Sequence, residues 1–586
     1  MIMNNNWNLC ELFASSTQAL QALDEAKNTS EAFCLFYEQR VNNLSAQNIL
    51  VALKRYEDLL VEIRKVENYA YLLHSTHLND KAISLFYQSV NDKVCILKKQ
   101  LVFFENWLIH GKNVDMAELK NILPKGTYNW LQKLRLWQKH SLSNDLEKLF
   151  ADENNVAQYW LRLYNETRAS LSFTIEKKDY TEGQLMKLFS HKDENIRKLA
   201  GNALFQKYTQ NRYLFALIYN AMLKGWQIDN HWHNFDYPEA SANLANCIEQ
   251  KDLENMVSTV IFNNVSIPQR YYALKAKVLG KNKLSYWDRD RAYPFEQNEE
   301  QYSIEKAKNI ILTAFNEFSP QFASIAQMFF DKDLIDYYPY AGKATGAYCT
   351  EPPVGVMPMV FLNYTGNLES VYMMAHELGH AVHEYLSQTQ GELGREKSCA
   401  QAETASIFAE QLVFNYLLKT AIHPQKRFVM LAKRLENTIL STFRQISFHR
   451  FEHFVATERE NGEVSVDKIE QAWLKYMQDY LGERVDTSEL APMWAAISHF
   501  FQSPFYVYSY CFSNCVVNAL YEIYSLKKVD NFEEKYMKML QNGGIENYRE
   551  ALSRFGIDAS VPDFWQKGLN IARKYLIELE NLYESF

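Results

Sequence analysis

The segment H-E-L-G-H at residues 376–380 constrains the fold of this chain more than any other feature. In an α-helix, residues four apart lie on one face, so the imidazoles of His376 and His380 can bind the same metal ion. Glu377 lies about 100° further round the helix, where its carboxylate can accept a proton from a metal-bound water. We therefore expect a helix here that supplies two metal ligands and a general base.

The residues around the two histidines indicate that this helix is closely packed. Leu378, Ala381 and Val382 are uncharged, as expected for a helix that faces the interior. Gly379 is unusual, because glycine inside a helix costs about 1 kcal/mol relative to alanine. The glycine therefore suggests that another segment, or the metal itself, approaches the helix closely at this position.

A catalytic zinc ion usually has three protein ligands and a water molecule. His383 follows His380 by three residues but lies about 10 Å along the helix axis from His376, so one ion should not reach it. Residues 398–410 read as a second helix, in which Glu403 and Glu410 lie seven residues apart and share a face. One glutamate can bind the metal, and the other can orient a ligand histidine.

Two other histidine patterns compete with this site. Residues 449–453 read H-R-F-E-H, the inverted form of the motif, but their flanks are charged and no comparable Glu-bearing helix follows. We expect a structural helix there. His231 and His233 flank a tryptophan in an aromatic segment, where packing or hydrogen bonding is the more common role.

Composition narrows the class of protein. The chain has 586 residues, of which 47% are hydrophobic, and its low content of glycine and proline favours one continuous, mostly helical body. The net charge is −8 and no basic stripe is evident, so nucleic acid is not expected as a partner. No run of 18 apolar residues exists, so no membrane association is expected. The oligomeric state is left open.

The beginning of the chain and its cysteines indicate a cytoplasmic protein. The first 26 residues contain no Lys or Arg, and no apolar segment typical of a secretory signal follows the start. The 8 cysteines show no paired spacing, which favours reduced thiols. Residues 357–363 form a short apolar segment that reads as a strand, and Pro358 suits an edge position to which an extended peptide could add.

Several blocks in a fixed order resemble the M3 metallopeptidases, and most closely their oligoendopeptidase F branch. They are residues 342–348 (GKATGAY), 359–366 (MVFLNYTG), 376–383 (HELGHAVH), 402–406 (AETAS) with Glu410, and 499–510 (HFFQSPFYVYSY). The resemblance implies a mainly α, large, two-lobed zincin-type fold with a deep channel and a small β-sheet beside the active-site helix. The helical pattern along the chain itself predicts a helical N-terminal region over residues 1–204, with the catalytic M3-like region in residues 205–586.

The resemblance also implies an activity: zinc-dependent hydrolysis of internal bonds in short oligopeptides. By this resemblance, His376, His380 and Glu403 bind one Zn²⁺ and Glu377 is the catalytic base. Glu410 and His383 are expected beside the ligands rather than on the metal. Manganese or cobalt could also support activity, since ligand type alone does not decide which metal is bound.

The resemblance further implies contacts to the substrate or the transition state from His499 and Tyr510. Because the tyrosines after His499 can be aligned in more than one way, Tyr506 and Tyr508 remain candidates. A histidine or tyrosine can donate a hydrogen bond to the developing oxyanion.

Two other functions remain open at this point. A zinc carboxypeptidase of another helical H-E-x-x-H family is one, although no arginine stands out in the motif blocks to bind a terminal carboxylate. A non-catalytic peptide-binding protein on the same fold is the other, and the intact set of His376, Glu377, His380 and Glu403 argues against it.

Overall fold

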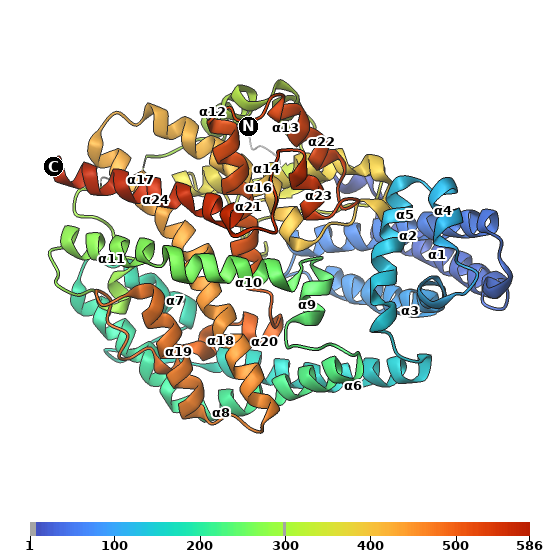
Figure 1. Ribbon diagram of the computed structural model, residues 1–586, viewed down its shortest axis with the longest axis horizontal. Coiled ribbons are helices and arrows are strands. Elements are labelled where there is room, and N and C mark those ends of the chain that lie inside the picture. The colour runs from blue at the N-terminus through green and yellow to red at the C-terminus, as the bar shows by residue number, and fades with distance from the viewer. Residues whose placement is uncertain (1–6, 297–299) are drawn as a thin grey trace. The chain divides into compact units, whose positions relative to one another are not determined.

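Helices make up most of the chain in the computed structural model, which describes residues 7–296 and 300–586 (Figure 1). These residues divide into two units, each built from three separate stretches. Unit 1 comprises residues 7–138, 300–420 and 524–557, and unit 2 comprises residues 139–296, 421–523 and 558–586. The mainly helical fold predicted from the sequence is confirmed.

Unit 1 contains the H-E-x-x-H segment. Its α-helices are α1 (Ser16–Tyr37), α2 (Ala46–Thr76), α3 (Lys81–His110), α4 (Met116–Ile122), α5 (Lys125–Leu136), α12 (Ile304–Phe318), α13 (Pro320–Asp331), α14 (Leu368–Ser387), α15 (Gly391–Gly394), α16 (Cys399–Thr420), α22 (Phe532–Gln541) and α23 (Tyr548–Ser553). Its strands are β3 (Ile335–Asp336), β4 (Tyr348–Cys349) and β5 (Val360–Phe361). Short 3-10 turns lie at Leu9–Glu11, Val41–Asn43 and Gln388–Gln390.

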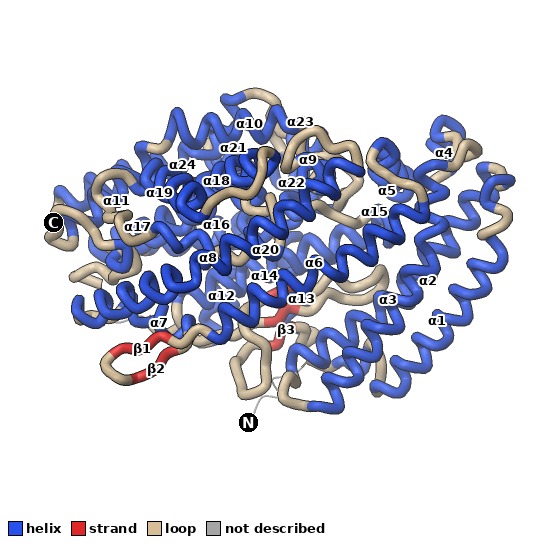
Figure 2. The backbone as a smooth tube through the Cα atoms, turned by 90° about the horizontal axis from the view of Figure 1, so that it is seen from below, coloured by secondary structure: helices blue, strands red, loops and turns tan. Residues whose placement is uncertain are grey.

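Polar caps begin the first three helices of unit 1. Ser15, Ser45 and Asp80 accept hydrogen bonds from backbone N–H groups in the first turns of α1, α2 and α3. Each cap satisfies a donor that has no partner inside the helix and contributes about 1 kcal/mol. The three helices pack against one another, as Figure 2 shows, around a buried aromatic cluster that includes Phe33 and Phe104.

A small sheet lies against α14, as the resemblance implied. Its strand order is β3-β5-β4, with β5 parallel to β3 and antiparallel to β4. The prediction that residues 357–363 form an edge strand is therefore wrong: β5 is the central strand and β4 is an edge. Pro358 is tolerated because it lies just before the paired residues, which start at Met359, so the missing proline N–H removes no hydrogen bond from the ladder.

A buried ion pair fixes one side of this sheet. Lys343 lies in the GKATGAY block, and its Nζ donates to Asp336 Oδ1 at 2.8 Å and to the backbone oxygen of Leu362 at 2.5 Å. Both charged side chains are fully buried. A buried charge must be paired and hydrogen-bonded to be tolerated, and these contacts meet that requirement.

Unit 2 carries the segment of residues 499–510. Its α-helices are α6 (Asn144–Ser170), α7 (Glu182–Lys187), α8 (Glu194–Trp232), α9 (Ala240–Ala245), α10 (Gln250–Ser258), α11 (Ser266–Val278), α17 (Pro424–Ser441), α18 (Phe443–Glu460), α19 (Val466–Leu481), α20 (His499–Gln502) and α24 (Pro562–Glu584), with most of α21 (Tyr508–Ser525). Strands β1 (Phe173–Ile175) and β2 (Lys178–Tyr180) form an antiparallel hairpin.

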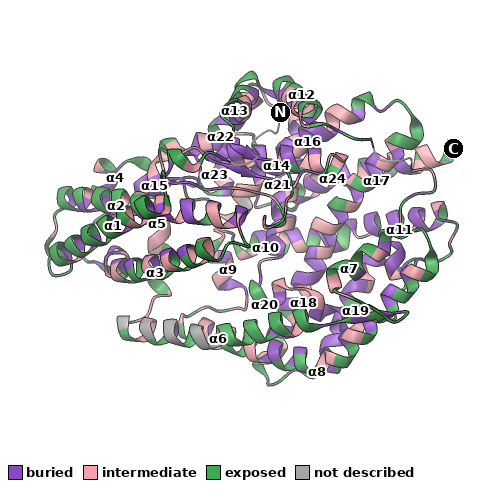
Figure 3. Cartoon of the chain, turned by 180° about the vertical axis from the view of Figure 1, so that it is seen from behind, coloured by how far each residue is buried: buried purple, intermediate pink, exposed green. Residues whose placement is uncertain are grey.

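The core of unit 2 is rich in aromatic side chains. Phe451, Trp473, Trp494 and Phe500 are buried and in ring contact where α18, α19 and the 3-10 helix Ala491–Ala496 meet. Buried residues are purple in Figure 3. This packing fixes α18, from which the inverted histidine motif projects.

The sequence also predicts a boundary between two regions and the absence of membrane-spanning helices. The boundary expected between residues 204 and 205 falls inside α8, and the assignment of residues 1–204 and 205–586 to separate regions stays a prediction. Among the helices of the described residues, none combines the length and the apolarity needed to cross a membrane.

Candidate metal centre and active site

The close packing predicted at Gly379 is present between α14 and α16. A Cβ atom at this position would lie 2.7 Å from the backbone oxygen of Ala405 and 2.7 Å from the Cα of Ser406. Only glycine fits such an approach without displacing a backbone. Because α14 and α16 touch here, the side chain of Glu403 reaches the histidines on α14.

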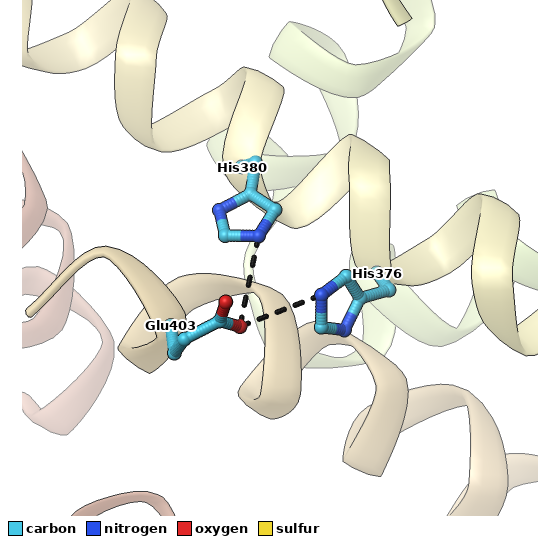
Figure 4. Close-up of side chains that lie close together, drawn as sticks. All are labelled: His376, His380 and Glu403. Atoms are coloured by element: carbon cyan, nitrogen blue, oxygen red, sulfur yellow. Dashed lines mark ion pairs between the residues drawn. The ribbon is translucent and has the colours of Figure 1, made fainter. Parts of the chain in front are cut away.

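His376, His380 and Glu403 converge on one point, as Figure 4 shows. One ligand atom from each lies within 4.8 Å of the others. Glu403 Oε2 is 3.4 Å from His376 Nε2 and 3.7 Å from His380 Nε2. Ligands about 2.0–2.2 Å from a tetrahedral ion lie about 3.4 Å apart, so these residues fit one zinc-sized ion.

The geometry separates the roles of the two glutamates on α16. Glu410 Oε2 lies 3.6 Å from Nδ1 of His376, the ring nitrogen that faces away from Glu403. A carboxylate at this nitrogen orients the ring and makes it a stronger ligand. Glu403 is oriented in turn by Ser406, whose Oγ donates a hydrogen bond to Glu403 Oε2 at 2.8 Å.

Carboxylates dominate the electrostatics of this cluster. Burial lowers the pKa of His376, but Glu410, Glu403 and Glu377 outweigh it and raise the pKa to about 9. Burial and the neighbouring charge of His376 lower the pKa of His380 to about 3. The concentration of negative charge around the two rings favours a bound cation.

Glu377 is suited to exchange a proton near neutral pH. Burial and the charge of Glu403 raise its pKa to about 7, although His376 and a hydrogen bond from the Cys349 backbone lower it. The side chain is 4% exposed. A general base works best when its pKa lies near the operating pH.

His383 lies outside the ligand cluster, as expected from its distance along the helix. It is buried, and its ring makes a hydrogen bond with the backbone of Ala402, close to Glu403 on α16. Burial lowers its pKa well below the usual value. Its place is between the two helices, where it supports their packing.

Residues 499–510 form a second cluster, within unit 2. His499 Nε2 lies 3.2 Å from the hydroxyl of Tyr510, and the ring of Tyr506 stacks on His499 with centroids 6.1 Å apart. All three side chains are partly exposed. Tyr508 differs, because it is fully buried and its hydroxyl donates to Asn243 Oδ1 at 2.6 Å. This burial argues against Tyr508 as a substrate contact.

The inverted motif at residues 449–453 holds no group with metal-ligand geometry. In the part of the chain that the structure describes, His376, His380 and Glu403 form the one such group. Glu452 instead accepts a hydrogen bond from the backbone N–H of Phe505 at 3.0 Å. His233 Nδ1 pairs with the backbone oxygen of Asp229, in keeping with the hydrogen-bonding role expected for it.

Comparison with known proteins identifies the family. Residues 186–571 match the sequence model of peptidase family M3. The chain belongs to peptidase family M3. It is therefore a metallopeptidase, in agreement with the metal-ligand geometry on α14 and α16.

Relatives of this M3 peptidase match along nearly the whole chain. An oligoendopeptidase F homolog of Borreliella burgdorferi is 24% identical, covering 99% of this chain and 98% of its own length. Oligopeptidase PepF of Bacillus subtilis is 24% identical, covering 92% of this chain and 81% of its own length. The crystal structure of oligoendopeptidase-F from Enterococcus faecium has the same fold, with a TM-score of 0.72 at 21% identity over 97% of this chain and 99% of that chain.

Two contacts of the M3 peptidase site were not predicted from its sequence. The backbone of Cys349, in edge strand β4, makes a hydrogen bond with the carboxylate of Glu377. The hydroxyl of Ser406 donates a hydrogen bond to Glu403 and orients it. Cys349 directly follows the GKATGAY block, so the block's position was a usable signal. Ser406 stands three residues after Glu403, within reach on the same helix face.

Proposed function

We propose that this M3 peptidase hydrolyses internal bonds of short oligopeptides, with one zinc ion held by His376, His380 and Glu403. The convergence of these three ligand atoms beside the buried carboxylate of Glu377 carries the proposal. The names of the relatives, oligoendopeptidase F and oligopeptidase, support oligopeptide substrates and internal cleavage over a carboxypeptidase or a binding protein.

Zinc bound there supplies a Lewis acid that lowers the pKa of a coordinated water and polarises the scissile carbonyl. Glu377 accepts the proton of the attacking water and then delivers it to the leaving amine. Its pKa of about 7 suits both directions of transfer. Glu410, beside Nδ1 of His376, would hold this ring in the orientation in which Nε2 can bind the metal.

Edge strand β4 offers a place for the substrate backbone. In the three-stranded sheet, β4 pairs with β5 along one side, and an extended peptide is proposed to add along the other side. Addition of a strand would align the peptide main chain through hydrogen bonds. The hydrogen bond from the Cys349 backbone to Glu377, the proposed base, supports this position for the substrate.

His499 and Tyr510 are proposed to stabilise the oxyanion. Their mutual contact of 3.2 Å supports a joint role, because the histidine orients the hydroxyl. Tyr506 stacks on His499 and is proposed to shape the same surface. A donor of this kind is commonly worth about 10²–10³ in kcat.

The cytoplasm is the proposed location, and peptide catabolism the proposed process. Cys511 and Cys515 lie one helical turn apart in α21 and keep free thiols, which suits a reducing compartment. Manganese or cobalt could replace zinc in activity measurements, since all three accept imidazole and carboxylate ligands.

The test is cleavage of an internally quenched peptide of roughly ten residues, long enough to lie extended along a strand. Wild type and Glu377→Gln are compared, with metal content measured on both and the cut located by mass spectrometry. We expect an internal cut by wild type and none by the metal-replete variant. Release of only the last residue would favour a carboxypeptidase, and tight binding without cleavage by metal-loaded wild type would favour a binding protein.

A further inference from the structure

A strained turn lies between His499 and Tyr510. It occupies residues 503–507, between α20 and α21. Phe505, at its centre, has a φ of 59°, in the left-handed region that bulky side chains avoid. Such a residue persists only when its surroundings hold it there.

Glu452 on α18 holds this turn. Its Oε1 accepts the backbone N–H of Phe505 at 3.0 Å, across 53 positions of the sequence. Glu452 is 1% exposed and Phe505 is fully buried, so water does not compete for this N–H group. A buried N–H without an acceptor is costly, and the carboxyl group of Glu452 therefore favours this one conformation of the turn.

The start of α21 has a second attachment to the same region. The hydroxyl of Tyr508 donates to Asn243 Oδ1, and the ring of His449 meets the ring of Tyr508 edge-on at 5.4 Å. His449 and Glu452 are both members of the inverted motif on α18. The motif thus contacts the chain on either side of Tyr506, at Phe505 and at Tyr508.

The turn decides how His499 and Tyr510 meet. The N–H of Ser503 donates a hydrogen bond to the backbone oxygen of His499, and the N–H of Tyr506 donates one to the backbone oxygen of Ser503. These two backbone hydrogen bonds connect α20 to the turn. A change in the φ of Phe505 would alter the direction in which the chain passes from α20 to α21. The contact of 3.2 Å between His499 Nε2 and the Tyr510 hydroxyl depends on that geometry.

We propose that Glu452 is a positioning residue for peptide hydrolysis: it fixes the left-handed turn at Phe505 and thereby sets the His499–Tyr510 pair. This inference rests on the proposed function of that pair. It gives the inverted histidine motif a role that needs no metal.

The test compares Glu452→Met, which removes the acceptor at similar volume, with Glu452→Gln, which keeps an acceptor oxygen. Burial raises the pKa of Glu452 to about 8, so glutamine resembles the neutral acid present at pH 7. We expect Glu452→Met to lower kcat by about 10- to 100-fold, as misplacement of a catalytic group does, with KM within about twofold. Glu452→Gln should retain most of kcat.

Two comparisons distinguish positioning from general damage. Val455→Ala creates a cavity at a fully buried site on the same helix and should lower the unfolding temperature without the kcat loss. In a Tyr510→Phe background, Glu452→Met should cause no further loss of kcat, because its effect passes through Tyr510. An equal kcat loss in Val455→Ala, or losses that multiply in the double variant, would overturn the proposal.

Crystal structures of the two Glu452 variants give a readout that does not need activity. The left-handed φ of Phe505 and the His499–Tyr510 contact should persist in Glu452→Gln and be lost in Glu452→Met. An unchanged turn in Glu452→Met refutes the positioning role even if wild type cleaves no peptide. A wild type without activity but with the expected turn change would instead refute the proposed function alone.

Discussion

Gly379 on α14 and Ser406 on α16 lie so close that a Cβ atom on the glycine would fall 2.7 Å from the Cα of its neighbour. Gly379→Ala must therefore push the two helices apart, and overpacking of this kind costs about 1–3 kcal/mol. We expect the variant to unfold at a lower temperature and to lose metal affinity, because Glu403 moves away from His376 and His380. Calorimetry and metal analysis measure the two effects.

The matched control for that variant is Gly225→Ala. Gly225 lies in helix α8, and a Cβ atom there would meet nothing within 4 Å. Alanine should stabilise this helix by up to about 1 kcal/mol. A Gly379→Ala protein as stable and as metal-rich as the Gly225→Ala protein would show that the close approach does not determine the site.

Glu403 and Glu410 should differ sharply when each is changed to glutamine. Glu403→Gln replaces an anionic ligand at 3.4 Å and 3.7 Å from the two imidazoles, so zinc binding should be largely lost. Glu410→Gln alters only the support of His376 and should weaken zinc binding by about 10- to 100-fold. Competition with a chromogenic chelator gives both constants. A weaker affinity in Glu410→Gln than in Glu403→Gln would reverse the two assignments.

Removing single hydroxyl groups distinguishes the tyrosines after His499. Tyr510→Phe should lower kcat by about 10²-fold or more while the unfolding temperature hardly changes, because Tyr510 is only partly buried. Tyr508→Phe removes the hydroxyl that donates to the buried Asn243 Oδ1 and should cost about 1–3 kcal/mol of stability with kcat retained. Steady-state kinetics and urea unfolding of both variants check this. A large kcat loss in Tyr508→Phe with Tyr510→Phe unaffected would exchange their roles.

The burial of Glu452 makes the folded protein sensitive to alkaline pH. Burial raises its pKa to about 8, Glu239 adds to the rise, and the Phe505 N–H opposes it. Tyr219 from α8 and His449 on its own helix also face this region. Because the folded state holds the proton more tightly, this contribution to stability is present below the unfolded pKa and is lost as pH rises through about 8.

Glu452→Gln should remove that sensitivity. Between about pH 6 and about pH 9, wild type should lose more stability in urea unfolding than the variant does, because only wild type must take up a proton on folding or bury a charge. Glu62→Gln, at an exposed position on α2, is the control and should follow wild type. Parallel curves for wild type and Glu452→Gln would contradict the raised pKa.

The metal helix and its partner could be predicted because their signals are local. The spacing of His376 and His380 requires a helix, Gly379 implies a close neighbour, and Glu403 with Glu410 gives that neighbour's inward face. Helix periodicity alone could not tell which of the two glutamates lies between the Nε2 atoms, because that depends on how α16 crosses α14. The resemblance in ordered motifs chose Glu403, and the distances agree with it.

Features that depend on distant pairing were missed. The strand after Pro358 looked like an edge, but β3 and β4 pair with β5 on its two sides, and nothing local in the sequence specifies that order. The hydrogen bond between Glu452 and the Phe505 backbone joins residues 53 positions apart. It involves the N–H of Phe505, so the side chain at that position gives no sign of it. Backbone acceptors and positive φ values at non-glycine residues leave little trace in composition or periodicity.

The order in which the chain is synthesised has a consequence for this metal centre. Helix α22 packs against α14. Tyr536 on α22 stacks its ring on Phe408 of α16. The Tyr536 hydroxyl donates a hydrogen bond to the backbone oxygen of Thr404, the residue after Glu403. A ribosome therefore delivers both histidines and the glutamate well before it delivers the helix that packs against them. A nascent chain that stalls ahead of residue 532 would present His376, His380 and Glu403 on an unfinished core, and we expect it to hold a metal ion less tightly than the full chain does.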